Sequence, residues 1–549
     1  MKRPANTLVG WQTFGIVCAA APLGFLGLFF FYPVINIVAK SLSQGWAGFS
    51  SIFGSPRARD AIWFTTWQAA VSTIVTVVLA MPCAAVIART SGKAGAWLKA
   101  LVTVPFVLPT IVVGGAFKEL FDRLNSSVGL PNLNQTAVAI IVAHSFFNFA
   151  VVARTVGAYW AGLDHRLEEQ ARTLGSSPVH VFSRVTWPRL KPAILAAGAI
   201  TFLFSFTSFG VVLVLGGLGQ ATIETEIFRH AVVRGDLTTS ASMSLIQIVA
   251  VLSLVAATSH LERKTNVSTQ MVRSVIAPLG NTTQTGIFVC SALFLGSPLL
   301  VMVERSLRTG DRYGFGNYTA LFDKIPQLPT TAAEALTNSL IYASMATVIA
   351  LCLGVLCALT IVSQPNRISR FSDLAATLPL GVSAVTVGFG ILVSLNRSPV
   401  DWRTSWWMVP TAHSVVAIPF VVRTIVPMLR QIHPSIREAA SLLGSSSLQI
   451  RRLIDLPLAV RGIKVAAGFA FAISIGEFGA TSFLPRRADT LTGPQAVFRL
   501  LGTPGDILRG QAMALSVLLA GTVAIAVVLS ELASSDKKGR TEEDLQIGS

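Results

Sequence analysis

Long stretches of apolar residues recur along the whole chain, and they constrain its fold more than any other feature. An apolar run of about 18 residues or more is typical of a segment that crosses a bilayer. Because a backbone in hydrocarbon must satisfy its own hydrogen bonds, each run is predicted to be helical. About twelve such spans are predicted, at residues 14–38, 61–88, 100–121, 136–160, 193–217, 240–260, 285–305, 337–362, 372–394, 406–428, 465–483 and 511–531.

Composition supports lipid as the surroundings. Of the 549 residues, 52% are hydrophobic and 13% are charged, whereas soluble domains carry about 25% charged residues. The formal net charge of +17 would favour nucleic acid as the partner of a soluble protein. Here the basic residues lie in short loops between apolar runs, which is typical of topology signals. We therefore expect the lipid bilayer, and no nucleic acid, as a partner.

The predicted spans form two sets of six, separated by a polar segment. We expect an all-α polytopic membrane protein with a first unit at 1–260, a cytoplasmic linker at 261–284, a second unit at 285–535 and a polar tail at 536–549. Lys and Arg are more numerous in the loops on the side of the termini, which predicts that both termini are cytoplasmic. The first apolar run is too long for a signal peptide, so we expect an uncleaved span.

The two halves share a motif at one constant spacing. Glu169-Gln-Ala-Arg-Thr-Leu-Gly175 is followed, after nine intervening residues, by Val185-Thr-Trp-Pro188. Glu438-Ala-Ala-Ser-Leu-Leu-Gly444 is followed in the same way by Ile454-Asp-Leu-Pro457. Farther upstream, Pro105 and Gly114 correspond to Pro379 and Gly388. Both copies run in the same direction, which indicates a parallel duplication with six spans per copy.

This motif resembles the signature of the permease subunits of binding-protein-dependent ABC importers. The second copy matches the pattern Glu-Ala-Ala, three residues, Gly, nine residues, Ile-x-Leu-Pro throughout; the first departs at Gln170, Val185 and Trp187. The resemblance covers nearly the whole chain. It implies the type I ABC importer permease fold, in two homologous six-helix units, and a location in the bacterial plasma (inner) membrane.

The residues of the motif predict a bent pair of short helices between the fourth and fifth span of each half. Gly175 is expected to stop the first helix, since glycine adopts backbone angles that other residues avoid. Ser177 is a candidate N-cap, with Pro178 at the first helical position, and the run Ser445–Ser447 offers the same chemistry in the second half. Pro188 and Pro457 are predicted to end the second helix of each pair.

The resemblance implies that this bent pair docks on an ATPase and transmits its movement. The ATPase-coupling residues would be Glu169, Ala171, Gly175, Pro188, Glu438, Ala439, Ala440, Gly444 and Pro457. The alanines would keep the docking face small, and the glutamates are candidates for a charge pair with the partner or for capping the bend.

The chain has no phosphate-binding loop of the G-x-x-x-x-G-K-[ST] type. We therefore expect no enzymatic activity and no bound cofactor, with ATP and Mg²⁺ handled by separate ATPase subunits, two copies in all. No metal-ligand cluster stands out. The seven histidines are scattered, and each is interpreted as a loop or helix-end residue.

Glu477 is the carboxylate predicted to lie well inside a span, where an ionisable group is costly and often lines a path. The repeat aligns it with Ser208. We expect both residues on the substrate path, with Glu477 favouring a cation; the alternative is a structural role for Glu477, paired with a neighbour.

Fused double permeases with this motif resemble the thiamine and iron(III) branch of importers. Segments such as Ala221-Thr-Ile-Glu-Thr-Glu226 are more similar to thiamine permeases. The resemblance also implies an extracytoplasmic binding protein that delivers the substrate. An ion-coupled secondary transporter with two six-helix halves remains the alternative; it predicts intramembrane carboxylates and no ATPase partner.

Overall fold

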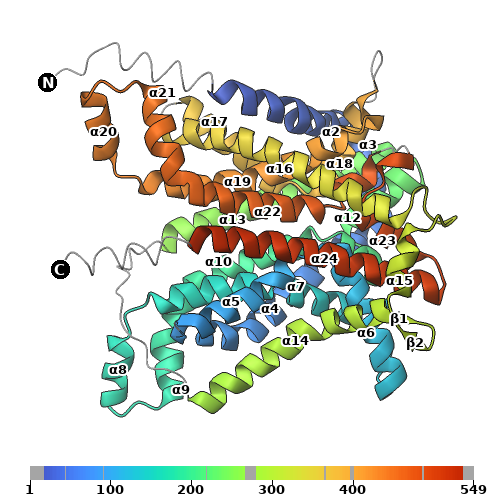
Figure 1. The fold of residues 1–549 in the computed structure, drawn as a ribbon, viewed down its shortest axis with the longest axis horizontal. Coiled ribbons are helices and arrows are strands. Elements are labelled where there is room, and N and C mark those ends of the chain that lie inside the picture. The colour runs from blue at the N-terminus through green and yellow to red at the C-terminus, as the bar shows by residue number, and fades with distance from the viewer. Residues whose placement is uncertain are drawn as a thin grey trace.

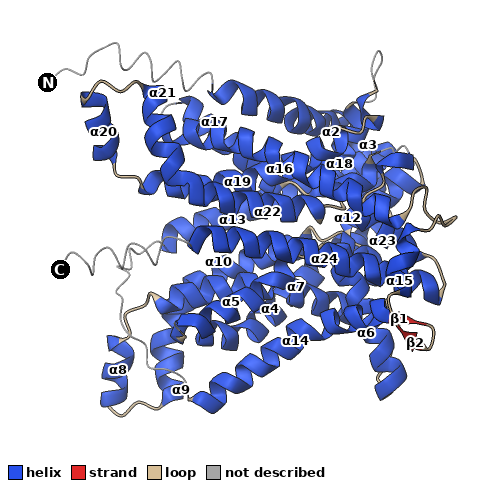
Figure 2. Ribbon diagram, viewed as in Figure 1, coloured by secondary structure: helices blue, strands red, loops and turns tan. Residues whose placement is uncertain are grey.

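The computed structural model describes residues 18–43, 45–90, 92–217, 219–265, 280–363, 367–395, 401–484 and 488–535. Most of the predicted linker, the predicted tail 536–549 and the start of the first predicted span lie outside these residues. The described residues are almost all helical (Figure 2), and their strands are the short antiparallel pair β1 (Arg308–Thr309) and β2 (Arg312–Tyr313).

Ten helices are long and apolar enough to cross a membrane. They are Cys18–Leu42, Pro56–Arg89, Ala137–Ala161, Pro178–Phe206, Leu237–Ala257, Thr282–Leu307, Ala332–Val362, Met408–Gln431, Leu448–Phe483 and Asp506–Ser530. Two bent pairs raise the number to 12 if each pair is one span. The predicted all-α membrane fold is confirmed.

The third predicted span of each half is a bent pair rather than a straight helix. Leu101–Val107 and Thr110–Val128 meet at 109°, and Arg367–Gly381 and Ala384–Ser394 meet at 102°. Pro109 explains the first bend, because the residue before a proline avoids helical angles. At the second bend Val382 is extended, and Ser383 caps the next helix by accepting the N–H of Thr386 at 3.1 Å. Hydropathy does not report such breaks.

The elements of the first half follow one another in chain order. They are η1 Gly27–Phe31, α2 Tyr32–Leu42, α3 Gly45–Gly54, α4 Pro56–Arg89, α5 Gly92–Val107, α6 Thr110–Val128, α7 Ala137–Ala161, α8 Arg166–Thr173, α9 Pro178–Val181, η2 Phe182–Thr186, α10 Trp187–Phe206, α11 Gly210–Leu215, α12 Ile223–Phe228, η3 Arg229–Val233 and α13 Leu237–Thr265.

The second half repeats this order, with additions around the strand pair. Its helices are α14 Asn281–Leu307, α15 Gly316–Thr319, η4 Ala320–Phe322, α16 Ala332–Ser363, α17 Arg367–Thr377, η5 Leu378–Gly381, α18 Ala384–Ser394, η6 Trp402–Thr404, α19 Met408–Gln431, α20 Pro434–Leu442, α21 Ser447–Ile450, η7 Arg451–Asp455, α22 Leu456–Ile475, η8 Ala480–Phe483, η9 Ala488–Thr490, α23 Gly493–Gly502 and α24 Asp506–Ser535.

The first long helix of each half packs against the other half. In Figure 1, α2 lies with the second-half helices α17 and α18, whereas α14 lies along the first-half helices. The contacts run across the halves and within them: α2 packs on α18 and also on α13 of its own half, and α14 packs on α6 and also on α24 of its own half. Leu26 and Phe30 accordingly enter the core of the second half, and Leu295 of α14 enters that of the first. The exchange ties the two halves into one body.

The two motif-bearing hairpins, α8–α9 and α20–α21, lie at the same end of the molecule, on the left in Figure 1. The described end of α13, the start of α14 and the end of α24 lie at this end too. The strands, α12, α15 and α23 lie at the opposite end. The two motif hairpins and these chain segments therefore share one end of the molecule.

Candidate functional site

The first hairpin is shaped by backbone hydrogen bonds at the end of α8. Gly175 has φ +82°, in the left-handed region, as the sequence analysis expected of a helix-stopping glycine. The N–H of Gly175 bonds to Arg172 O at 2.9 Å, and the N–H of Ser176 bonds to Ala171 O at 3.0 Å. This double bond pattern is a Schellman motif. Ala171 therefore contributes its carbonyl to the bend.

The second hairpin repeats this geometry at the end of α20. Gly444 has φ +88°. Its N–H bonds to Ser441 O at 3.1 Å, and the N–H of Ser445 bonds to Ala440 O at 3.0 Å. Ser446 then caps the next helix by accepting the N–H of Gln449 at 3.3 Å, while the Gln449 side chain accepts the N–H of Ser446. The repeat thus extends from residue identity to single hydrogen bonds.

Ser177 is the N-cap of α9, as expected. Its hydroxyl oxygen accepts a hydrogen bond from the backbone N–H of His180, with 3.5 Å between the nitrogen and the oxygen. Pro178 occupies the first helical turn. The first half therefore contains the predicted pair of short helices, α8 and α9.

The predicted ends of the second short helices at Pro188 and Pro457 are wrong. Both prolines lie in the first turn of a helix that continues into the membrane, α10 or α22. A π-helical turn precedes each: the N–H of Trp187 bonds to Phe182 O, and that of Leu456 bonds to Arg451 O. Each proline lies just after a turn that departs from the α-helical pattern, so its missing donor does not break the helix. The first hairpin thus continues into α10, and the second continues into α22.

Buried polar groups fasten the base of each hairpin to that long helix. In the first half, Thr186 donates to Oε1 of Glu168 at 2.8 Å. At the repeat-related positions of the second half, Nε of Arg437 donates to Oδ1 of Asp455 at 2.8 Å, and Arg451 pairs with the other carboxylate oxygen. Asp455 is fully buried. The base of each hairpin is therefore hydrogen-bonded to the turn that leads into α10 or α22.

The tips of the hairpins expose apolar side chains. Leu174 is 86% exposed, and Leu442 and Leu443 are 87% and 88% exposed. Glu169, Glu438 and Ala439 are also exposed, whereas Ala171 and Ala440 are partly buried. An apolar tip that projects from one end of the molecule is suited to a protein partner.

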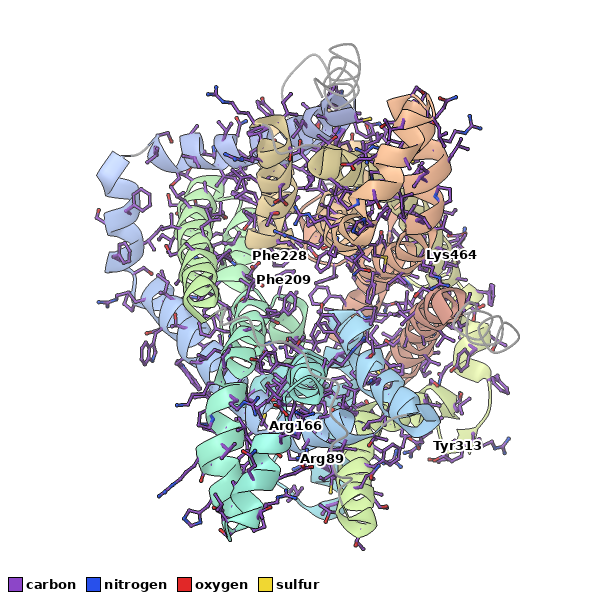
Figure 3. All side chains as sticks on the ribbon, turned by 90° about the vertical axis from the view of Figure 1, so that its left-hand side faces the viewer. Arg89, Arg166, Phe209, Phe228, Tyr313 and Lys464 are labelled. Atoms are coloured by element: carbon purple, nitrogen blue, oxygen red, sulfur yellow. The ribbon has the colours of Figure 1, made fainter. Side chains whose placement is uncertain are left out.

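A cavity of about 440 Å³ lies between the two halves. Seven phenylalanines line it: Phe106, Phe147, Phe204, Phe209, Phe420, Phe469 and Phe478. Phe209 of the first half stacks on Phe478 of the second, with ring centroids 5.5 Å apart. Figure 3, viewed from the hairpin end, shows Phe209 in the middle of the molecule beside Phe228. The breaks after α5 and α10 and the turn after α22 bring these side chains together.

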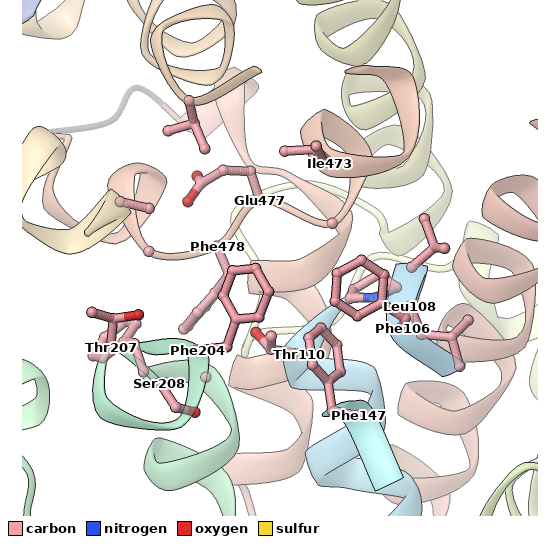
Figure 4. A pocket seen from close by; sticks show the side chains of 18 of the residues that line it. Phe106, Leu108, Thr110, Phe147, Phe204, Thr207, Ser208, Ile473, Glu477 and Phe478 are labelled. Atoms are coloured by element: carbon pink, nitrogen blue, oxygen red, sulfur yellow. The ribbon is translucent and has the colours of Figure 1, made fainter. Parts of the chain in front are cut away.

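Glu477 and Ser208 both line this cavity, from opposite halves of the chain (Figure 4). Glu477 lies two residues after the end of α22 and is 6% exposed. Its carboxylate accepts the N–H of Ala480 at 2.9 Å, the N–H of Thr481 at 3.1 Å and the hydroxyl of Thr481 at 2.7 Å. It therefore caps η8, so the expected structural pairing is present beside its place on the cavity wall.

Two histidines are buried within the long helices α7 and α19, contrary to the expectation of loop or helix-end positions. His413 in α19 lies 2.9 Å from both Ser474 and Thr481 and 3.5 Å from Glu477. His144, at the repeat-related position of α7, lines the cavity and is 2% exposed. In the sequence, His144 precedes Glu169 by the same number of residues as His413 precedes Glu438. This equal spacing was the sequence signal that the two histidines occupy related positions.

Close packing explains one paired glycine. A Cβ atom on Gly388 would lie 2.4 Å from the carbonyl oxygen of Ala480, so only glycine lets α18 approach η8 this closely.

Comparison with known families places the chain. Residues 76–267 and 350–532 each match the model of the binding-protein-dependent transport system inner membrane component, and together they cover more than half of the chain. The chain belongs to this family. It is therefore a duplicated, multi-pass inner-membrane permease subunit of a binding-protein-dependent ABC importer, without catalytic activity of its own. Systems of this family work with an ATPase and a binding protein, so the ion-coupled secondary transporter is set aside.

The permease is similar to several curated proteins. The thiamine transport system permease protein ThiP of Salmonella typhimurium is 24% identical over 497 residues, covering 86% of this chain and 88% of the relative. The ThiP protein of Brucella abortus is 24% identical over 525 residues, covering 91% and 93%. The molybdenum transport system permease protein ModB of Mycobacterium tuberculosis is 31% identical over 234 residues, covering 41% of this chain and 88% of the relative.

One solved structure has a weaker likeness. A chain of a bacterial ABC transporter involved in the import of the acidic polysaccharide alginate is 16% identical at a TM-score of 0.41, covering 48% of the permease and 98% of that chain.

Proposed function

We propose that this permease imports a small aromatic organic cation, of which thiamine is the leading candidate. The cavity between the halves carries the proposal. Its wall combines seven phenylalanines with a single carboxylate, that of Glu477, and no Lys or Arg belongs to the described wall. Aromatic faces attract cations and stack on flat rings. A volume of about 440 Å³ falls in the range of small-molecule sites, about 300–1,000 Å³.

Other substrates of related importers fit this wall less well. An oxyanion such as molybdate would need positive or N–H donor groups, and the charge at the wall is that of a carboxylate. A bare ferric ion would need several oxygen or nitrogen ligands, and the described residues contain no group of three or more His, Cys, Asp or Glu able to hold a metal. The thiamine-permease relatives cover most of the chain, whereas the molybdenum-permease relative covers only part of it.

We further infer the path of the driving force. Two copies of an ATPase dock on the exposed tips at Leu174 and at Leu442–Leu443, on the cytoplasmic side, which also carries both termini. ATP and Mg²⁺ are bound by these partners. The residues that shape the hairpins, Glu169, Ala171, Gly175 and Pro188 with Glu438, Ala439, Ala440, Gly444 and Pro457, transmit the movement to the halves. An extracytoplasmic binding protein delivers the substrate at the opposite end.

Uptake of labelled thiamine tests the proposal. The permease, its ATPase and its binding protein are reconstituted in proteoliposomes, and ATP-dependent uptake is measured with unlabelled thiamine, ferric citrate and molybdate as competitors. We expect uptake that only thiamine suppresses. The absence of ATP-dependent thiamine uptake, or thiamine uptake that molybdate or ferric citrate suppresses as strongly as unlabelled thiamine, would overturn the proposal.

A further inference from the structure

The first-half wall of the cavity contains buried polar atoms without partners. Asn148 is 1% exposed and His144 is 2% exposed. The atoms Oδ1 of Asn148 and Nε2 of His144 make no hydrogen bond within the described residues. Both residues line the cavity and lie four positions apart on α7, which places them on one face of that helix. Unpaired polar atoms in an apolar interior are costly, so these two atoms need a partner that the described residues do not supply.

Hydrogen bonds fix the orientation of the Asn148 amide. Its Nδ2 donates to the carbonyl oxygen of His144 at 3.1 Å and to the hydroxyl oxygen of Ser205 at 3.3 Å. The amide nitrogen must occupy this side, because a carbonyl oxygen can only accept. The acceptor Oδ1 is consequently left for a donor from the cavity.

The imidazole of His144 is held from behind. Ser72 Oγ lies 3.4 Å from its Nδ1. When the Ser72 hydroxyl donates to Nδ1, the proton of the neutral ring is on Nε2, which makes Nε2 a donor. This face of α7 then carries one acceptor and one donor, about one helical turn apart.

The second half lacks such an open pair. Ala417 takes the place of Asn148 in the repeat, and His413 is already engaged by Ser474 and Thr481. The cavity therefore has an unfilled polar face on one side, the capped carboxylate of Glu477 on the other, and phenylalanines at both.

We propose that His144 and Asn148 form a subsite for the edge of an amino-substituted nitrogen heterocycle. The exocyclic amino group donates to Asn148 Oδ1, and the adjacent ring nitrogen accepts from His144 Nε2. The inference rests on the proposed function, because it specifies which part of an aromatic cation the first half recognises.

Binding of small fragments tests the subsite without relying on transport. The full-length permease with its ATPase in nanodiscs is titrated with 4-aminopyrimidine and with 4-hydroxypyrimidine by saturation-transfer NMR. We expect the amino compound to bind at least about tenfold more tightly than the hydroxy compound, whose edge presents the wrong donor–acceptor order. Equal binding of the two compounds would overturn the proposal.

Matched variants locate the effect. Asn148→Leu and His144→Phe should each weaken 4-aminopyrimidine binding about tenfold and remove the preference over the hydroxy compound. Ser145 is next to His144 but accepts a hydrogen bond from Thr76 and does not line the cavity. Ser145→Ala should therefore leave both the affinity for 4-aminopyrimidine and the preference over the hydroxy compound unchanged. Size-exclusion profiles identify a variant that fails to fold, in which case the other variant and the two wild-type titrations decide.

The outcomes separate the subsite from the proposed function. Fragment binding that depends on Asn148, without thiamine uptake by the reconstituted importer, sinks the thiamine proposal and keeps the subsite. Thiamine uptake together with fragment binding that is unaffected by Asn148→Leu and His144→Phe sinks the subsite alone.

Discussion

Arg437 donates from Nε to Oδ1 of Asp455 at 2.8 Å, and this bond joins the base of the second hairpin to the start of α22. The repeat-related pair in the first half, Glu168 and Thr186, makes the same connection with a hydroxyl donor. The chemistry has changed between the halves while the mechanical link has been kept. A link at this position is what a rigid lever between a docking tip and a span requires.

Asp455→Asn should loosen the second hairpin more than Thr186→Val loosens the first. The Asp455 variant leaves two arginines, Arg437 and Arg451, without their buried carboxylate, at a cost of about 3–5 kcal/mol. Thr186→Val removes one hydrogen bond to a carboxylate, worth about 1.5–3 kcal/mol. Thermal unfolding of the purified proteins measures both, and an unchanged midpoint for Asp455→Asn would contradict the link.

Gly444→Ala should destabilise the second hairpin by about 1–2 kcal/mol. The cost comes from the backbone alone, since φ is +88° and an added Cβ atom would meet nothing within 4 Å. Gly444→Asn should be milder because asparagine tolerates left-handed angles. The control is Gly502→Ala, where the space is also open and φ is ordinary. Transport-coupled ATPase activity and thermal midpoints are compared; equal effects of the Ala changes at Gly444 and Gly502 would argue against the strained turn.

Leu443→Asp should release the ATPase. The side chain is 88% exposed at the tip of the second hairpin, so its replacement has little effect on folding and a large effect on an apolar contact. Co-purification of the ATPase with the permease provides the measurement. Phe322→Asp serves as the control, because Phe322 is 73% exposed in η4 at the opposite end of the molecule. ATPase retained by Leu443→Asp as fully as by the control would exclude the tip as the docking site.

Glu224, in α12 at the end opposite the hairpins, should give the permease a pH-dependent stability. Burial raises the pKa of this carboxyl to about 8, although hydrogen bonds from Ser383 and Gln247 act in the opposite direction. The folded protein then holds a proton that the unfolded chain has lost, so stability falls as pH rises from about 4.5 to about 8, by up to about 4–5 kcal/mol. Glu224→Gln should flatten this slope. Thermal midpoints at pH 5, 6.5 and 8 decide, and parallel slopes for the two proteins would refute the assignment.

The helix-stopping glycines could be predicted because a single residue type decides the backbone angle at Gly175 and Gly444. The course of the chain at Pro188 could not, because a π-helical turn, set by the packing of the whole element, accommodates the proline. Hydropathy located the third spans but not their bends at Pro109 and Val382.

The wall of the cavity was partly visible in the sequence. Glu477 and Ser208 are brought to one cavity, as the repeat suggested. The phenylalanines around them, and the unpaired face of His144, depend on which helices meet across the two halves. Such contacts arise from tertiary packing, which the hydrophobic periodicity of a sequence does not predict.

Glu477→Gln separates the charge of this residue from its structural role. The amide cannot accept from both backbone N–H groups that the carboxylate now binds, so a loss of about 1–3 kcal/mol is expected. If the carboxylate also attracts the cation, the KM for thiamine uptake should rise at least about tenfold. Thr481→Val is the matched variant, since it removes a hydrogen bond to Glu477 at 2.7 Å and keeps the charge. Uptake is normalised to folded protein in each case. Equal KM values for the two variants would assign Glu477 to structure alone, and so would a KM for Glu477→Gln equal to that of the wild type.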